Sequence, residues 1–377
     1  MPPDASNLHK DAFVADLHSD TVLQMKRGYD IALRHSENHI DIPRLIEGGV
    51  NLQVFACFVG FDTPEETCPA ETDELLDILQ GEFERLSDKI DVCLTSSEAR
   101  TIVKSGKIAA FLGIENGMAI NNDLALLDHF HKRGVRYMTL IHNRSNEWCI
   151  ASNDTSPAFA GLTDFGCDVV HRMNELGMIV DISHVHPLGV EKVLEVTTKP
   201  IIASHSCAHA ICPHNRNLTD EQLRALADNG GMVGINYHGD FISRKRWAMS
   251  RAIEERDHEL KEEIMIYYFS GPDSSMDQAT RDRFDKYIID WENEIRPVNP
   301  NLSEVVDHID YVAKLIGDDY VGLGSDYDGI FLPPDGLDDT AKVPGITDEL
   351  IARGYTEGSA KKILGENFLR VFRDNCG

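Results

Sequence analysis

Eight short apolar runs recur along the chain, separated by segments with helical spacing. Each run is rich in Val, Ile, Leu and Ala, a composition typical of a parallel strand buried on both faces. The runs occupy residues 12–18, 50–58, 108–116, 136–142, 178–184, 200–206, 231–237 and 320–326. Eight strands that alternate with helices predict an α/β fold of the (β/α)8 TIM-barrel type.

The intervening segments include residues 73–88, 124–134, 167–177 and 219–230, and several begin with Thr or Asp and end in Gly, as helices do. Residues 1–377 are therefore assigned to a single (β/α)8 domain. Between the seventh and eighth runs, residues 239–302 form a densely charged insertion with helical spacing. This insertion is interpreted either as a solvated helical excursion or as a lid over the site or a subunit contact.

Ionisable residues stand at or next to the C-terminal ends of six of these runs. They are His18, Glu115, His142, His184, His205 and Asp326. In a (β/α)8 barrel the C-terminal ends of the strands converge on one face, where the loops build the active site. Core packing does not readily explain six such residues at six strand ends, so the pattern predicts a functional site.

Five residues of this face and its loops have the chemistry of metal ligands. His18 and Asp20 are two residues apart on a strand, so their side chains point the same way, and imidazole with carboxylate suits zinc. Glu115 ends an apolar run, where a charge is costly unless it is paired or bound to metal. His184 and His205 close consecutive strands. The five exceed what one tetrahedral zinc with an open position requires, so we predict two metal ions bridged by Glu115.

Other candidates for ligands are weaker. His39 and Asp41 repeat the H-x-D spacing, but they open a helix-like stretch, where residues two apart diverge, and we reject them. His186 stays open as an alternative ligand. His209 and His214 are expected near the pocket without binding metal, and Cys207 is interpreted as a small buried filler.

Composition and net charge indicate which classes of binding partner the protein is expected to have. The net charge is −27, with 42% hydrophobic and 26% charged residues, values that indicate a globular protein. The negative charge argues against nucleic acid and disfavours anionic membranes. The sequence has no apolar run long enough to span a membrane, no signal-peptide pattern, and eight cysteines without a C-x-x-C pair. These features predict a cytoplasmic protein with reduced thiols.

An ordered series of motifs resembles the membrane (renal) dipeptidases of the amidohydrolase superfamily, including their soluble bacterial relatives. The series is DLHSDT, DIPRLIEGGVNLQVFA, FLGIENG, GVRYMTLIHNRSN, GMIVDISHV, PIIASHSCAHAICPHNRN, GMVGINY, GLGSDYDG and GENFLRVF. It covers nearly the whole chain. The resemblance implies a (β/α)8 barrel with two Zn²⁺ per chain, for which Mn²⁺ or Co²⁺ can substitute.

The resemblance also implies roles for individual residues. It makes His18 and Asp20 ligands of one zinc and His184 and His205 ligands of the other, with Glu115 bridging both. His142 is implied to contact the substrate carbonyl or the tetrahedral intermediate. Arg216 is implied to hold the terminal carboxylate of the substrate, Asp326 to transfer protons, and Tyr237 to line the pocket.

The predicted activity is hydrolysis of dipeptides that carry a free C-terminal carboxylate, with tolerance of D-residues at the C-terminal position. By resemblance alone, a homodimer is also expected. One alternative is another hydrolase of the superfamily, a lactonase, amidase or deaminase, although such enzymes commonly begin with H-x-H rather than H-x-D. The second alternative is a barrel that binds metal or ligand without turnover. Asp326 and Arg216 argue against it, since a binding protein has no use for a proton shuttle.

Overall fold

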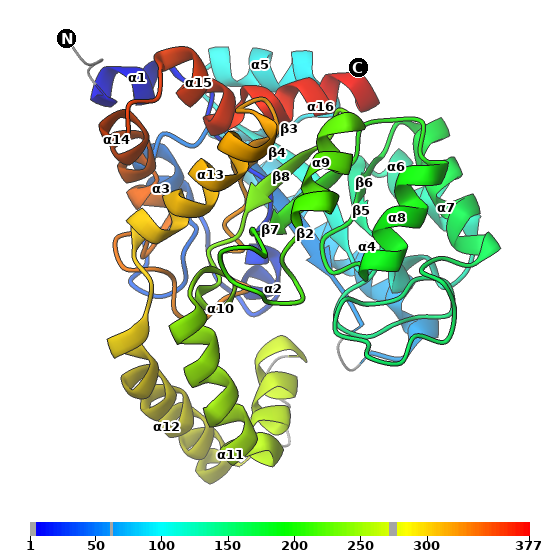
Figure 1. Cartoon of the computed structure of the whole chain (residues 1–377), viewed down its shortest axis with the longest axis vertical. Helices are drawn as coiled ribbons and strands as arrows, with labels where there is room; N and C mark the ends of the chain where they lie inside the picture. The colour runs from blue at the N-terminus through cyan, green and yellow to red at the C-terminus, as the bar shows by residue number, and fades with distance from the viewer. Residues whose placement is uncertain (1–4, 61–62, 271–276) are drawn as a thin grey trace.

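Eight parallel strands close into a barrel in the computed structural model of the chain, which describes residues 5–60, 63–270 and 277–377 (Figure 1). The barrel strands are β1 (Ala15–Asp16), β2 (Leu52–Phe58), β4 (Ile108–Glu115), β5 (Val135–Thr139), β6 (Ile179–Asp181), β7 (Ile202–Ser206), β8 (Met232–Ile235) and β9 (Val321–Leu323). Each of them pairs with the next, and β1 pairs with β9, which closes the ring. The predicted (β/α)8 barrel is confirmed, and each predicted run contains or overlaps one barrel strand.

One further strand, β3 (Ile90–Val92), pairs in parallel with the first residues of β4, from Ile108 to Ala110. This strand was not predictable from the sequence, because a run of three residues with an exposed Asp91 at its centre lacks the apolar signature of the barrel strands.

Helices surround the barrel, and the capping residues at their ends explain where several begin. The helices outside the insertion are α1 (Ala5–Asp11), α2 (Thr21–Lys26), α3 (Ile42–Glu47), α4 (Cys68–Arg85), α5 (Ser96–Lys104), α6 (Leu124–Lys132), α7 (Asp164–Leu176), α8 (Pro187–Val196), α9 (Asp220–Asp228), α13 (Leu302–Ile316), α14 (Pro344–Ala352), α15 (Glu357–Lys361) and α16 (Asn367–Cys376). Helix α9 begins with a capping box in which Thr219 and Gln222 satisfy each other's backbone N–H groups. Among the described residues, no helix combines the length and the apolar character needed to cross a membrane.

The barrel interior is filled from its N-terminal end. Inward-facing side chains such as Ala109 and Phe111 of β4 belong to one buried cluster with Phe368 and Phe372 of α16. The ring of Phe111 lies edge-on to both phenylalanines, with centroids 5.4 and 4.9 Å apart. The C-terminal helix therefore closes this end of the barrel, and Glu115, on the same face of β4 as Phe111, lies toward the opposite end.

The rejected pair His39 and Asp41 has a structural role. Asp41 caps α3 by accepting from Arg44 N, and its carboxylate also accepts from the Arg44 Nε–H at 2.7 Å. His39 Nδ1 lies 3.1 Å from the Asp328 carboxylate. None of the metal-ligand groups among the described residues includes either residue.

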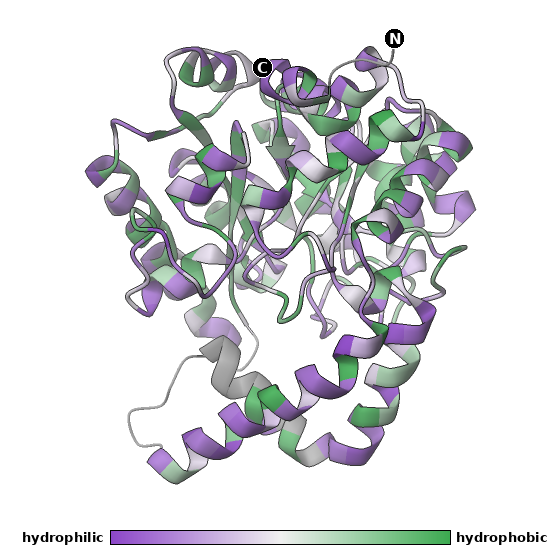
Figure 2. Ribbon diagram, turned by 90° about the vertical axis from the view of Figure 1, so that its left-hand side faces the viewer, coloured by the Kyte–Doolittle hydropathy of each residue, from purple (hydrophilic) through white to green (hydrophobic). Residues whose placement is uncertain are grey.

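The insertion is helical. It contains α10 (Gly239–Ile242), α11 (Arg244–Ser270), α12 (Gln278–Ile295) and the 3-10 turn Arg296–Val298, and α11 has a kink at Asp257. Helices α11 and α12 project from the barrel as a hairpin (Figures 1 and 2). Arg246 fixes the hairpin at its base, because its guanidinium lies 3.0 Å from the Asp240 carboxylate and 5.0 Å from the centre of the Trp291 ring. The function of this insertion stays a prediction.

Candidate metal centre

The five predicted metal ligands meet at the C-terminal end of the barrel. His18 follows β1, Asp20 stands at the N-terminus of α2, and Glu115 is the last residue of β4. His184 follows β6, and His205 lies within β7. All five side chains are buried.

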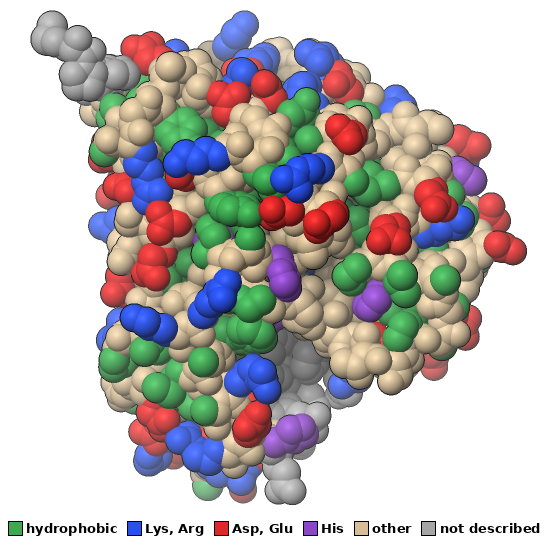
Figure 3. All heavy atoms as spheres, in the orientation of Figure 1, with side chains coloured by type: hydrophobic (Ala, Val, Ile, Leu, Met, Phe, Trp, Pro, Cys, Tyr) green, Lys and Arg blue, Asp and Glu red, His purple; other side chains and the backbone are tan. Residues whose placement is uncertain are grey.

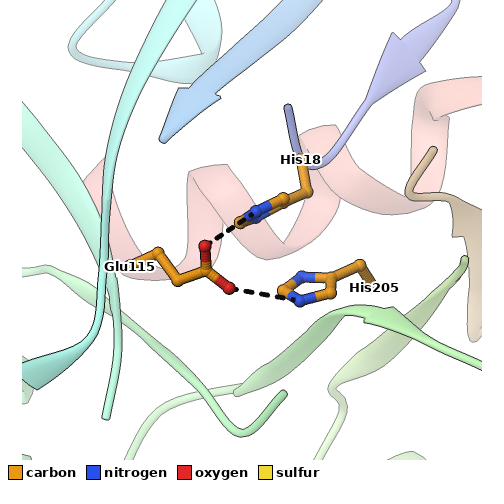
Figure 4. A group of neighbouring side chains, drawn as sticks. All are labelled: His18, Glu115 and His205. Carbon is orange, nitrogen blue, oxygen red and sulfur yellow. Dashed lines mark ion pairs between the residues drawn. The ribbon is translucent and has the colours of Figure 1, made fainter. Parts of the chain in front are cut away.

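The two oxygens of the Glu115 carboxylate face different histidines, and Figure 4 shows one oxygen paired with His18 and the other with His205. Its Oε2 atom is 3.4 Å from His18 Nε2, and its Oε1 atom is 3.1 Å from His184 Nε2 and 3.5 Å from His205 Nε2. Asp20 Oδ2 is 3.6 Å from His18 Nε2. One carboxylate oxygen thus faces the His18 side and the other faces the His184 and His205 side, which is the arrangement expected of a bridging ligand.

Each of the three histidines uses its second ring nitrogen for a hydrogen bond. His18 Nδ1 donates to the Tyr137 hydroxyl (2.8 Å), His184 Nδ1 to Asn143 Oδ1 (3.0 Å) and His205 Nδ1 to Ser204 Oγ (2.8 Å). The Ser204 hydroxyl in turn donates to Asp181 Oδ2 at 2.6 Å. The three Nε2 atoms lie 3.1 to 3.5 Å from the Glu115 carboxylate, and those of His184 and His205 are 2.9 Å apart. Outer hydrogen-bond partners of this kind are typical of metal-binding histidines.

Unpartnered buried atoms indicate that the group fits a metal ion. Among the described residues, His18 Nε2 and Asp20 Oδ1 are buried without a hydrogen-bond partner. A buried polar atom without a partner is costly, and a divalent cation would satisfy both. The donor set of imidazole nitrogens and carboxylate oxygens suits zinc, manganese or cobalt.

Burial also sets the protonation of His184 and His205. It lowers the pKa of His184 and of His205 well below the usual value, and the positive charge of Arg216 adds to the effect. Both imidazoles are therefore neutral at pH 7, the form that binds metal. Burial together with the charge of Glu115 raises the pKa of Asp20 to about 6. A bound cation would oppose that shift by favouring the carboxylate.

Asp326 and His142 face the same centre. Asp326 has a ligand-capable oxygen within 4.8 Å of the ligand atoms of His18 and Asp20, and its Oδ2 atom accepts from Asn236 Nδ2 at 2.9 Å. Burial is the main cause that raises the pKa of Asp326 to about 7. His142 Nε2 lies 4.0 Å from Glu115 Oε1, and burial lowers the pKa of His142 to about 3, so this imidazole is neutral.

Arg216 brings a buried positive charge to the edge of the centre. Its side chain is 6% exposed and donates to Ser206 Oγ at 3.4 Å and to the His205 carbonyl at 3.2 Å. Its Nε atom has no partner among the described residues. Burial lowers the pKa of Arg216 to about 10, so the guanidinium remains charged and is available to a carboxylate.

Two adjoining cavities lie over these residues. The inner cavity, of about 130 Å³, is lined by Asp20, Phe58, Glu115, His142, Asn143, His184, Arg216, His238, Phe241, Asp326 and Gly329. The outer chamber, of about 380 Å³, lies between the barrel loops and the α11–α12 hairpin. Figure 3 shows the surface hollowed between the hairpin and the barrel body. The candidate metal ligands and Asp326 therefore lie behind the outer chamber.

Tyr237 lies apart from this group. It is 1% exposed, its ring packs edge-on against Tyr327, and it is not among the described residues that line either cavity. The adjacent His238 lines both cavities. Of the weaker candidates, His186 caps α8 through Leu188 N, while Cys207 is buried with its Sγ atom 3.3 Å from the Asn236 carbonyl.

Three residues at the centre were not predicted from the sequence. Asn143 and Asn236 hold His184 and Asp326, and Tyr137 holds His18. Asn143 could have been suspected from its place next to His142. Tyr137 lies within β5, and its ring fits because β4 has a glycine opposite it: a Cβ atom at Gly113 would lie 2.6 Å from the ring.

We expect Tyr137→Phe to lower metal affinity by about 10- to 100-fold, because it removes the partner that orients the His18 ring. Competition titration with a chromophoric chelator measures this affinity. Tyr327→Phe is the matched control, since the Tyr327 hydroxyl is buried but donates to the Leu337 carbonyl, away from the metal ligands. Equal affinities in the two variants would contradict a role for Tyr137 at the centre.

Comparison with known proteins identifies the family to which the chain is similar. The profile of the family described as membrane dipeptidase (peptidase family M19) matches residues 3–375. Dipeptidase tcpJ of Claviceps purpurea (strain 20.1) is 28% identical over 374 residues, which are 95% of this chain and 76% of that protein.

Two solved structures illustrate the fold that this chain shares with other proteins. The probable dipeptidase PvdM from Pseudomonas aeruginosa superposes with a TM-score of 0.81 at 24% identity, covering 98% of this chain and 97% of that one. A metallo peptidase from Rhodobacter sphaeroides, liganded with a phosphinate mimic of the dipeptide L-Ala-D-Ala, gives a TM-score of 0.76 at 24% identity, covering 97% and 99%.

Proposed function

Because the chain belongs to the membrane dipeptidase family (peptidase family M19), a family of metal-dependent hydrolases, we propose that it is a two-zinc dipeptidase acting on dipeptides with a free C-terminal carboxylate. The observation that carries this proposal is the position of the Glu115 carboxylate, with His18 facing one oxygen and His184 and His205 facing the other. His18 and Asp20 would hold one ion, and His184 and His205 the second. When bound, two such ions supply Lewis acidity that lowers the pKa of water toward about 7.

The chain's own residues supply the proton transfers and orientation. Asp326 would take a proton from the attacking water and return it to the leaving amine, since Asn236 fixes its carboxylate over the centre. His142, being neutral, can donate a hydrogen bond to the oxygen on which negative charge develops. We propose no substrate contact for Tyr237, because its ring packs against Tyr327 and it is not among the described residues that line either cavity.

Arg216 would hold the terminal carboxylate. Its planar guanidinium offers paired N–H donors that match a carboxylate, and its burial strengthens that interaction. This contact would restrict the enzyme to substrates whose carboxylate follows closely after the scissile bond.

We expect Arg216→Lys to lower kcat/KM for dipeptides by about 10- to 100-fold, the equivalent of a charged hydrogen bond or more. Comparing each dipeptide with its C-terminal amide provides the control. The native enzyme should favour the free acid strongly, and the variant should favour it much less. If both forms of the enzyme discriminate equally between acid and amide, Arg216 does not hold the carboxylate.

Tolerance of a D-residue at the C-terminal position is part of the proposal. The Rhodobacter sphaeroides metallo peptidase binds a phosphinate mimic of L-Ala-D-Ala, and it shares the fold of this chain. Rates measured with L-Ala-L-Ala and L-Ala-D-Ala test this tolerance directly.

One assay separates the proposed function from its alternatives. The purified chain, loaded with Zn²⁺ and analysed for metal content, is offered L,L- and L,D-dipeptides together with lactones, simple amides and aminated heterocycles. Hydrolysis of dipeptides at two metal ions per chain supports the proposal. Turnover confined to the other compounds would support a different hydrolase of the superfamily, and metal binding without any turnover would support a binding protein. Size-exclusion chromatography tests the expected homodimer.

A further inference from the structure

The outer chamber and the inner cavity share part of their walls. The shared lining residues are Asn143, Arg216, His238, Phe241 and Gly329. Glu115, His142, His184 and Asp326 line the inner cavity and are absent from the lining of the outer chamber. A substrate that reaches these four residues therefore lies next to the outer chamber, and Arg216 is one of the residues that line both spaces.

On the proposed function, the small inner cavity places part of the substrate in the outer chamber. The inner cavity measures about 130 Å³. Pockets for small ligands usually measure about 300–1,000 Å³. The outer chamber, at about 380 Å³, lies within that range. A dipeptide with its scissile bond between Glu115 and Asp326 thus has part of its bulk in the outer chamber.

The position of Arg216 indicates which part of the dipeptide enters the outer chamber. On the proposed function, Arg216 binds the terminal carboxylate, and it stands at the border between the two cavities. The side chain of the C-terminal residue branches from the carbon next to that carboxylate. It is therefore the group closest to the outer chamber, whereas the N-terminal residue lies across the scissile bond from Arg216.

The chemistry of the chamber wall favours a large apolar side chain. Helices α11 and α12 contribute Ile253, Ile264, Ile288 and Trp291, and the loop after β9 contributes Ile330 and Phe331. Ile253 and Ile264 are buried, at 2% and 3% exposure. The Arg246 charge at this wall is matched by the Asp240 carboxylate 3.0 Å away, so this pair adds no net charge. An apolar wall of this kind gains most from burying aliphatic or aromatic surface.

We propose, resting on the dipeptidase function above, that the outer chamber is the specificity pocket for the C-terminal residue of the substrate and selects large apolar side chains. The insertion then has a defined function: its two helices form one wall of that pocket. Dipeptides ending in Phe, Trp or Leu are the expected substrate class, and dipeptides ending in Gly or Asp are expected to be poor substrates.

The test compares two adjacent residues of α12. Ile288 lines the chamber, whereas Ile289 is 58% exposed and does not. Values of kcat/KM are measured for L-Ala-Phe, L-Ala-Leu, L-Ala-Gly and L-Ala-Asp with the native enzyme, I288D and I289D. Thermal unfolding and metal content confirm that each variant is folded and loaded.

The native enzyme should favour L-Ala-Phe over L-Ala-Gly by at least about tenfold, the effect of a few buried carbons in an apolar pocket. I288D should reduce that ratio by about tenfold or more, and I289D should leave it as in the native enzyme. Equal rates with Phe and Gly, or equal ratios in the two variants, would overturn the specificity pocket while leaving the dipeptidase function intact. Absence of hydrolysis of every dipeptide would overturn both.

Discussion

Glu115→Gln is expected to remove at least one metal ion and to lower kcat/KM by at least about 10³-fold, because water without a metal ion has a pKa of about 15.7 instead of about 7. The substitution keeps the size of the side chain and removes the charge that faces His18 on one side and His184 on the other. A neutral amide cannot bridge two cations as a carboxylate does. Metal analysis after gel filtration, together with the dipeptide assay, measures both effects.

The matched control is Glu147→Gln. Glu147 is exposed on the loop after β5 and accepts a hydrogen bond from Asn122 Nδ2 at 3.0 Å, away from the metal ligands. The Glu147→Gln variant should keep native metal content and activity. A Glu115→Gln enzyme that still binds two ions at native affinity would exclude Glu115 as the bridge.

Asp326→Asn has the second largest expected effect. We expect kcat to fall by about 10²- to 10⁴-fold, the usual contribution of a positioned acid or base, with metal content unchanged. The amide oxygen can still accept from Asn236, so the side chain keeps its position, but it cannot take up the proton of the attacking water. Steady-state kinetics and metal analysis on the same sample provide the two readouts.

The metal analysis also distinguishes two roles for Asp326, because its carboxylate lies close enough to His18 and Asp20 to be a ligand. Loss of one ion would identify it as a ligand, and full kcat would exclude it from catalysis altogether. Asp338→Asn, an exposed residue of the same loop, is the control and should change neither value.

The barrel was predictable because its strands are buried on both faces, so their apolar runs stand out against the amphipathic helices. The same burial made Glu115 conspicuous, since a carboxylate at the end of IAAFLGIE needs a partner. The first run overestimated strand length: residues 12–18 contain a strand of two residues, although backbone hydrogen bonds to β9 and the segment after it continue through Leu17, His18 and Asp20.

Other parts of the centre could not be predicted from residue patterns. Arg216 lies in an irregular loop, and its role came from family resemblance alone. Tyr137 and Asn236 act through hydrogen bonds to residues far away in the chain, and such contacts leave no periodic signal. His184 and Asp326 both have left-handed backbones, with φ of 68° and 62°, a conformation that is uncommon outside glycine and is set by the surrounding loops.

The α11–α12 hairpin over the barrel mouth limits which molecules can reach the metal centre. A nucleophile at the end of a chamber of about 380 Å³ is out of reach of the chain of a folded protein, whose backbone cannot enter without extensive local unfolding. We therefore expect an enzyme of this shape to hydrolyse short peptides and to leave folded proteins around it intact.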